Sequence, residues 1–177
     1  MLIKKGLGTT CWIANAAAEQ DRTRFLEMVA LFQRYADRYA FDDLMVGAQA
    51  YRGSRPQQDL KSPVVAIGVM QVMPATAKDP NIAIPDIQEL ESNIHAGIKY
   101  LRFIQDEYFA DAQFDDFNKV MFAFASYNAG PNKIARPRKR AAEKGLDPNV
   151  WFNNVELVVA EKVGRETDQD VSNILKS

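Results

Sequence analysis

Apolar residues at three- and four-residue steps constrain this chain more than any other feature of its sequence. The pattern is clearest over residues 25–39, where the members of one helix face are Phe25, Met28, Val29, Phe32, Tyr35, Ala36 and Tyr39. It returns over residues 87–109 and 117–124, where Phe117, Val120, Met121 and Phe124 should point inward. No run of strand length alternates between apolar and polar residues. We therefore predict an all-α fold.

Capping and helix-breaking residues predict where the first of these helices begin and end. Asp42 or Asp43 can cap a helix that runs through Tyr51, because a short acidic side chain accepts a hydrogen bond from a free backbone N–H. Gly53 lies where that helix should stop, and glycine is the residue most often found just past a helix end. Pro74 should open a short helical turn over residues 74–77.

Similar signals mark the C-terminal third. Asp115 or Asp116 can open a helix that Gly130 and Pro131 end. Residues 133–144 are strongly basic, and we expect a solvated helix face with a break near Pro137. A further buried helix should follow, built on Trp151, Phe152, Val155, Leu157, Val158 and Val159.

Composition excludes several classes of protein. The 177 residues fit one domain, and a net charge of -1 gives no overall attraction to nucleic acid. No stretch approaches the roughly 18 apolar residues of a membrane-spanning helix. One cysteine, Cys11, cannot form an internal disulfide, and one histidine, His95, excludes a His-rich metal site. His95 lies off the apolar stripe of its helix, so we predict a boundary residue, and we expect no metal or cofactor.

Residues 48–77 form an unusually long connection between two helical patterns. A loop of this length in a compact domain is usually functional or disordered, and its apolar residues from Val64 to Met73 argue against disorder. One interpretation is a loop that covers the core. The other is the floor of a binding cleft, with Gln71 as its polar group.

Two segments carry a resemblance to a known family: Gly68-Val69-Met70-Gln71-Val72-Met73-Pro74-Ala75-Thr76-Ala77 and Ser126-Tyr127-Asn128-Ala129-Gly130-Pro131. Together they resemble the two signature segments of the lytic transglycosylase (SLT) domain, a lysozyme-like fold that cleaves bacterial peptidoglycan. The resemblance also covers residues 93–101 and 147–156. It implies an all-α, lysozyme-like domain over residues 19–177, after a linker from an upstream region over residues 1–18.

The position of the catalytic acid departs from this family. Its members carry Gln-Glu-Ser after the Ala-Tyr that matches residues 50–51, and that Glu is their only catalytic acid. This chain has Arg52, Gly53 and Ser54 there. A glycine cannot transfer a proton. A Glu codon becomes a Gly codon by one base change, so a sequence error is a further explanation of Gly53.

A second departure lies near the C-terminus. The family has Glu-Thr-x-x-Tyr, whose tyrosine touches the acid, whereas Asp170 takes that place here. Both changes concern one spot, so the site was either abandoned or rebuilt with Asp170 as a displaced acid. We give less weight to the rebuilt site, because an aspartate is short.

The resemblance implies roles for five further positions. Ser54 matches the serine beside the acid. Met70 and Gln71 match residues that line the sugar subsites, and Tyr127 and Asn128 match residues that face the reacting sugar. Structural roles compete: Met70 as core filler, Tyr127 as a cap on the hydrophobic cluster, Asn128 as a helix C-terminal residue. The joint pattern favours the cleft for Gln71, Tyr127 and Asn128.

These observations predict a peptidoglycan-recognising lytic transglycosylase domain, impaired in catalysis. The family reaction cleaves the bond between N-acetylmuramic acid and N-acetylglucosamine without water and leaves 1,6-anhydro ends. The alternatives are a non-catalytic glycan-binding module and a helical interaction domain that uses the basic residues 133–144. The expected partner is the glycan strand, with no nucleic acid, and the expected setting is a monomer in the periplasm of the bacterial envelope.

Overall fold

The protein is a set of helices gathered around one central helix. The computed structural model describes residues 7–54, 66–110 and 113–162. In chain order its elements are α1 (Leu7–Tyr39), α2 (Asp43–Ser54), α3 (Pro74–Lys78), α4 (Leu90–Tyr108), α5 (Asp116–Ala129), α6 (Pro131–Glu143), the π-helical η1 (Trp151–Val155) and α7 (Glu156–Lys162). Within those ranges, β pairing is limited to one bridge between Ile67 and Val72. The all-α prediction is confirmed.

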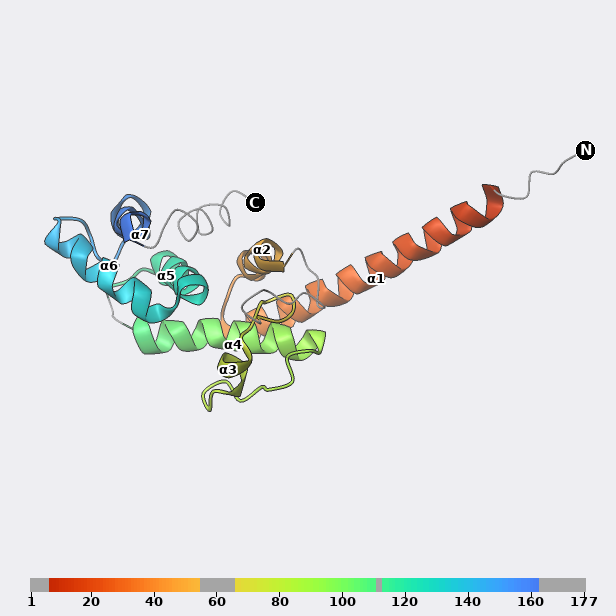
Figure 1. Ribbon diagram of the computed structural model, residues 1–177, viewed down its shortest axis with the longest axis horizontal. Coiled ribbons are helices and arrows are strands. Elements are labelled where there is room, and N and C mark those ends of the chain that lie inside the picture. The colour runs from red at the N-terminus through yellow and green to blue at the C-terminus, as the bar shows by residue number, and fades with distance from the viewer. Residues whose placement is uncertain (1–6, 55–65, 111–112, 163–177) are drawn as a thin grey trace, which may run out of the picture.

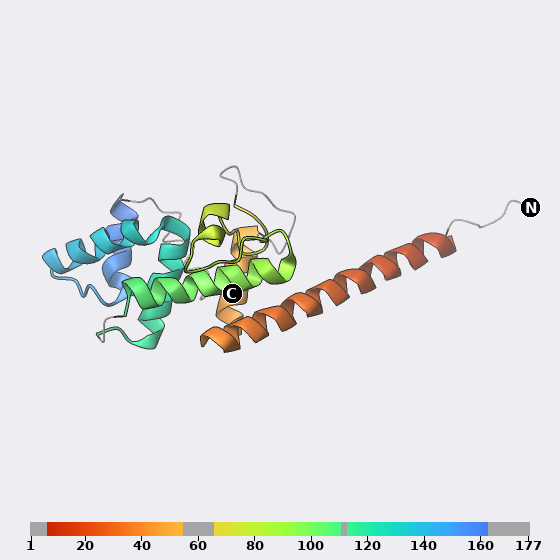
Figure 2. The same cartoon turned by 90° about the horizontal axis from the view of Figure 1, so that it is seen from below.

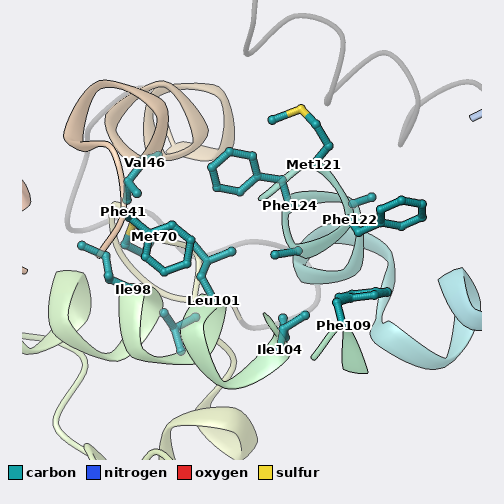
Figure 3. Packing of buried hydrophobic residues seen from close by; sticks show 14 of the residues in the cluster. Phe41, Val46, Met70, Ile98, Leu101, Ile104, Phe109, Met121, Phe122 and Phe124 are labelled. Atoms are coloured by element: carbon teal, nitrogen blue, oxygen red, sulfur yellow. The ribbon is translucent and has the colours of Figure 1, made fainter. Parts of the chain in front are cut away.

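Helix α4 is the spine on which the others pack. Its N-terminal part lies along α1, and its C-terminal part lies against α5 (Figure 1). Ile98, Leu101 and Ile104 of α4 are fully buried and meet side chains from α2, the loop before α3, and α5 (Figure 3). The apolar stripe read from the sequence of this segment is therefore the face that α4 buries.

Helix α1 extends well beyond this core. Its N-terminal half projects away from the other helices in both views (Figures 1 and 2). Phe25 and Leu26 are each 55% exposed, whereas Phe32, Tyr35 and Ala36 are buried. The helix begins at Leu7, so residues 7–18, which we assigned to a linker, are helical.

The predicted caps hold at two helices. Asp42 Oδ1 accepts a hydrogen bond of 2.9 Å from the Met45 N–H at the start of α2. Asp115 accepts one of 2.6 Å from the Asn118 N–H at the start of α5. Gly130, at φ 94°, ends α5, and Pro131 opens α6 directly after it.

Three details of the predicted helices are wrong. Phe117 is 46% exposed and Leu157 is 49% exposed, because each lies on the outer side of a helix whose neighbours face the core. Helix α6 runs through Pro137 without a break. A proline inside a helix costs about 3 kcal/mol. Burial of Ile134, Pro137 and Ala141 against the core offsets that cost.

The final buried helix is also interrupted. Phe152 has an extended conformation (ψ 137°) and Asn153 a positive φ of 57°, so the chain kinks inside η1. Trp151, Val155, Val158 and Val159 are nonetheless fully buried, as predicted. None of the helices in the described ranges has the length and apolar content to cross a membrane.

Candidate functional site

The candidate site lies where the end of α2, the loop over residues 66–73 and the end of α5 meet. Gln49 Nε2 donates a hydrogen bond of 2.8 Å to Asn128 Oδ1, which joins α2 to α5. Gln49 is buried beside Val46 and Ala50, so these residues define the inner face of α2. Gly53 follows Gln49 by four residues in the same helix, and residues at this spacing share a face. The helix thus places position 53 on the side that faces the site.

Gly53 is part of helix α2. The helix ends at Ser54, so Gly53 belongs to its last turn and is not the residue that follows the helix. Any residue except proline can adopt this helical backbone conformation without strain. The side chain of Ser54, and Asp170 altogether, lie outside what the structure describes.

The loop over residues 66–73 is a tight turn closed by backbone hydrogen bonds. Ile67 and Val72 exchange two N–H···O bonds of 3.0 Å each. Gly68 (φ 76°) and Gln71 (φ 49°) have left-handed backbone conformations inside this turn. The Gln71 side chain folds back, and its Nε2 donates a bond of 2.8 Å to the Gly68 carbonyl. The turn therefore fixes Gln71 from both its backbone and its amide, and the side chain remains half-buried.

Asn93 of α4 holds this loop through hydrogen bonds to its backbone. Its Oδ1 accepts a bond of 2.8 Å from the Met70 N–H, and its Nδ2 donates to the carbonyls of Ile67 (2.9 Å) and Ile87 (3.0 Å). The side chain is fully buried, so these bonds satisfy groups that water cannot reach. Asn93 was part of the family resemblance, but no local pattern indicated this role.

Two glycines allow the loop to lie this close to α4. A Cβ on Gly68 would come within 2.5 Å of the Asn93 side chain. A Cβ on Gly97 would come within 2.7 Å of the Met70 side chain. Real Cβ atoms do not approach other heavy atoms so closely, so both positions need glycine. The Met70 side chain itself is buried in the core, the packing role that competed with a cleft role for it.

Tyr127 and Asn128, neighbours on α5, reach two different walls of the site. The Tyr127 hydroxyl donates a bond of 2.8 Å to the Met70 carbonyl in the loop. Asn128 accepts the bond from Gln49 of α2. Burial raises the pKa of Tyr127 well above its ordinary value, so the hydroxyl stays protonated as a donor. The second signature segment, at the end of α5, therefore connects α5 both to the loop and to α2.

The structure thus brings together Met70, Gln71, Tyr127 and Asn128, and it places the backbone of Gly53 on the adjoining face of α2. Gln49 was missed by sequence reasoning. Its spacing was the available signal, because Gln49 lies four residues before Gly53, the position that resembles the family's acid. The bonds described here use amides, a phenol and backbone groups, and none of these groups exchanges protons readily near neutral pH.

His95 lies apart from this site, at the boundary that the sequence predicted. Its Nε2 forms a hydrogen bond of 2.8 Å with the Tyr39 hydroxyl, and its ring stacks on Tyr35 at 4.4 Å between centroids. It borders a groove of about 750 Å³ between α1 and the start of α4. Burial, with the positive charges of Arg38 and Lys99, lowers the pKa of His95. The imidazole therefore joins two helices as a neutral ring.

The described residues offer no set of side chains suited to binding a metal ion. Within the described ranges, no three His, Cys, Asp or Glu side chains gather closely enough to hold a metal ion.

Comparison with known proteins adds to this geometry. The family model described as the Transglycosylase SLT domain matches residues 30–149. A membrane-bound lytic murein transglycosylase F of Desulfosudis oleivorans is 32% identical over 136 residues, which cover 77% of this chain and 29% of the relative. Proteins of the same name match from Vibrio campbellii (32% identical; 68% of this chain and 22% of the relative) and Vibrio cholerae (31%; 73% and 23%). The chain thus spans less than a third of the length of these relatives.

Proposed function

Because this chain belongs to the transglycosylase SLT domain family, we propose that it recognises the glycan strand of peptidoglycan but is impaired in cleaving it. One observation carries the proposal. The inner face of α2 meets α5 through the bond from Gln49 to Asn128, and the next position on that face is Gly53. The walls of the site are in place, and the position that resembles the catalytic acid has no side chain.

The chemistry explains why this one position matters. Cleaving a glycosidic bond requires an acid that protonates the departing oxygen while positive charge develops on the sugar. In the reaction that the family resemblance implies, the same carboxylate then takes the proton from the sugar's 6-hydroxyl, and the ring closes to a 1,6-anhydro product. General acid–base groups typically contribute about 10²–10⁴ in rate, and a single acid that acts twice lies at the upper end. A glycine at position 53 removes both steps.

Substrate recognition can survive this loss. The contacts that shape the site come from the loop over residues 66–73 and from α5, and they do not depend on an acid at position 53. This arrangement favours the second candidate function, a glycan-binding module without catalysis. The two candidates differ only in whether any cleavage remains. If cleavage remains, Asp170 is the first residue to test as its acid, although we expect none from the unmodified chain.

The deciding experiment compares the unmodified chain with Gly53→Glu and with its matched control Gly53→Gln, which has the same shape but no acid. Each protein is mixed with purified peptidoglycan, and both turbidity and the mass spectrum of soluble fragments are recorded. We expect 1,6-anhydro products from Gly53→Glu alone, and cosedimentation with peptidoglycan for all three proteins. Protein that stays in the supernatant would contradict glycan recognition.

Anhydro products released by the unmodified chain would contradict the proposed impairment. In that case Asp170→Asn should abolish the activity if Asp170 is the displaced acid, and an unchanged rate would exclude it. We place the protein in the periplasmic part of the bacterial envelope, where this substrate lies, and expect a monomer. Sedimentation analysis of the purified chain tests the monomer.

A further inference from the structure

Helix α6 carries a concentration of positive charge that the proposed cleavage site does not use. It contains five basic residues and one acidic residue, Glu143, within thirteen positions, although the whole chain has a net charge of -1. The basic residues are Lys133, Arg136, Arg138, Lys139 and Arg140. A local excess of one sign attracts ligands of the opposite sign, even where the whole molecule is nearly neutral.

One of these cations has a structural role. Arg138 Nε donates a bond of 3.0 Å to the Pro148 carbonyl, and its guanidinium also contacts the Asn149 side chain. The same group lies 4.3 Å from the centroid of the Phe114 ring. Arg138 therefore holds the segment after α6 against the core. Lys144, just past the helix, is likewise engaged, in an ion pair of 2.7 Å with Glu161.

The other four cations, Lys133, Arg136, Lys139 and Arg140, are exposed. Ile134, Pro137 and Ala141 define the buried face of α6, and helical spacing places these four on its outer side. None of them forms an ion pair with a residue in the described part of the chain. Basic side chains elsewhere do so, as in Arg34 with Glu91 (3.0 Å) and Arg102 with Asp106 (2.8 Å). We call Lys133, Arg136, Lys139 and Arg140 the α6 cationic face.

A mainly apolar hollow of about 320 Å³ adjoins the α6 cationic face. It lies between the end of α4 and the flank of α6, and its lining consists of Tyr108, Phe109, Pro131, Ala135, Arg138, Lys139, Ala142 and Pro148. Lys139 belongs to both features, so a cation lies at the rim of the hollow. A ligand that fits both would have small apolar groups beside free carboxylates.

We propose that the α6 cationic face and its hollow bind an acidic peptide, namely the carboxylate-bearing peptide stems that the glycan strands of peptidoglycan carry. This inference rests on the proposed function for the source of the peptide. The argument for the ligand class is charge complementarity: four exposed cations, none of them in an ion pair with a described residue, cover the outer side of α6, and Lys139 among them also lines the mainly apolar hollow. Guanidinium groups bind carboxylates in a two-pronged geometry, and Arg136 and Arg140 supply two of them one turn apart.

The test measures binding of three probes. These are intact peptidoglycan, the same glycan after an amidase has removed its peptides, and the free stem peptides. The variant is Arg136→Gln/Lys139→Gln/Arg140→Gln. Its matched control is Arg22→Gln/Arg24→Gln/Lys78→Gln, which removes the same charge from exposed positions on α1 and α3. Circular dichroism and the melting temperature of each protein establish that it is folded.

We expect the α6 variant to bind intact peptidoglycan and free stem peptides about tenfold more weakly than the unmodified chain, since each exposed charge pair contributes a modest amount. The matched control should bind like the unmodified chain. Binding to the peptide-free glycan should not change. The difference should shrink near 1 M salt, where charges are screened beyond about 3 Å.

Two results would overturn the inference. One is equal binding of stem peptides by the α6 variant and the unmodified chain. The other is a loss that appears equally with RNA and with a teichoic acid, since the face would then attract any polyanion. Failure of the proposed function looks different, because the unmodified chain would then fail to bind the peptide-free glycan. The stem-peptide result is judged separately from that outcome.

Discussion

Two regions beside the candidate site are built in opposite ways. The loop over residues 66–73 is held by two hydrogen bonds with Asn93, by the Tyr127 hydroxyl and by close contact across Gly97. Helix α2, which carries position 53, has room to spare: a Cβ on Gly47 would meet no atom within 4 Å. The loop is fixed by interlocking contacts, whereas α2 has free space at Gly47.

We therefore expect substitutions in the two regions to affect different properties, namely stability in the loop and chemistry at position 53. A substitution in the fastened loop should damage the fold first and the site as a consequence. The contacts described for the loop come from Asn93, Gly97 and Tyr127 and not from position 53. These contacts are the physical basis for proposing recognition without efficient cleavage.

The largest effect should follow the loss of the Asn93 side chain. Asn93→Ala leaves the buried Met70 N–H without its acceptor, which costs about 1–3 kcal/mol, and it removes the bonds to the carbonyls of Ile67 and Ile87, each worth about 0.5–1.5 kcal/mol. We expect the free energy of unfolding to fall by about 3 kcal/mol or more in urea titrations. Asn81→Ala, at an exposed asparagine, is the control and should change it by less than about 0.5 kcal/mol. Equal effects of the two substitutions would refute the special role of Asn93.

Replacing a glycine by alanine in each of the two regions should have an intermediate effect on stability, and the two effects should have opposite signs. Gly97→Ala pushes a Cβ into Met70 and should destabilise the fold by about 1–3 kcal/mol. Gly47→Ala adds the same atom to open space in a helix and should stabilise it by about 0.5–1 kcal/mol. Thermal unfolding of both variants tests the comparison directly. A stabilising Gly97→Ala would show that Met70 can move aside at little cost.

The smallest effect should come from the Tyr127 hydroxyl. Tyr127→Phe removes one hydrogen bond to the Met70 carbonyl and keeps the ring, so we expect a loss of about 1 kcal/mol. Tyr108→Phe, at a tyrosine 37% exposed, is the matched control and should be nearly silent. If the loop depends on this bond, binding of the peptide-free glycan should weaken in Tyr127→Phe and not in Tyr108→Phe, because Tyr108 lines the hollow that we assign to the peptides. Unchanged binding and stability would mean that Asn93 alone holds the loop.

The sequence predicted most of the helices because their signals are local. An apolar stripe at helical spacing predicted α4, and Asp42 and Asp115 predicted two starts through caps that reach only three residues. The errors arose where tertiary packing outweighs local preference. Pro137 does not break α6, because the helix is anchored on the core at both sides of it. Phe117 faces outward, because periodicity alone does not say which residues at the edge of a stripe are covered.

The contacts that build the site could not be predicted in the same way. Gln49 and Asn128 are 79 positions apart in the chain, and Met70 and Asn93 are 23 apart. Hydrogen bonds over such separations leave no periodic trace in a sequence. The roles of Gly68 and Gly97 also depend on how closely two segments approach, and this is known only once both are placed.

By itself, the sequence determined the all-α class, the two segments that carry the family resemblance, and a glycine at the position that resembles the family's catalytic acid. Those features are local or depend on residue identity alone. The tertiary structure decided that Asn93, Gly97 and Tyr127 fix one wall of the site and that Gln49 and Asn128 connect α2 to α5. It also decided which cations of α6 are exposed and which, like Arg138, bind another part of the described chain. The physical reason is the same in each case: burial and pairing are properties of neighbours in space.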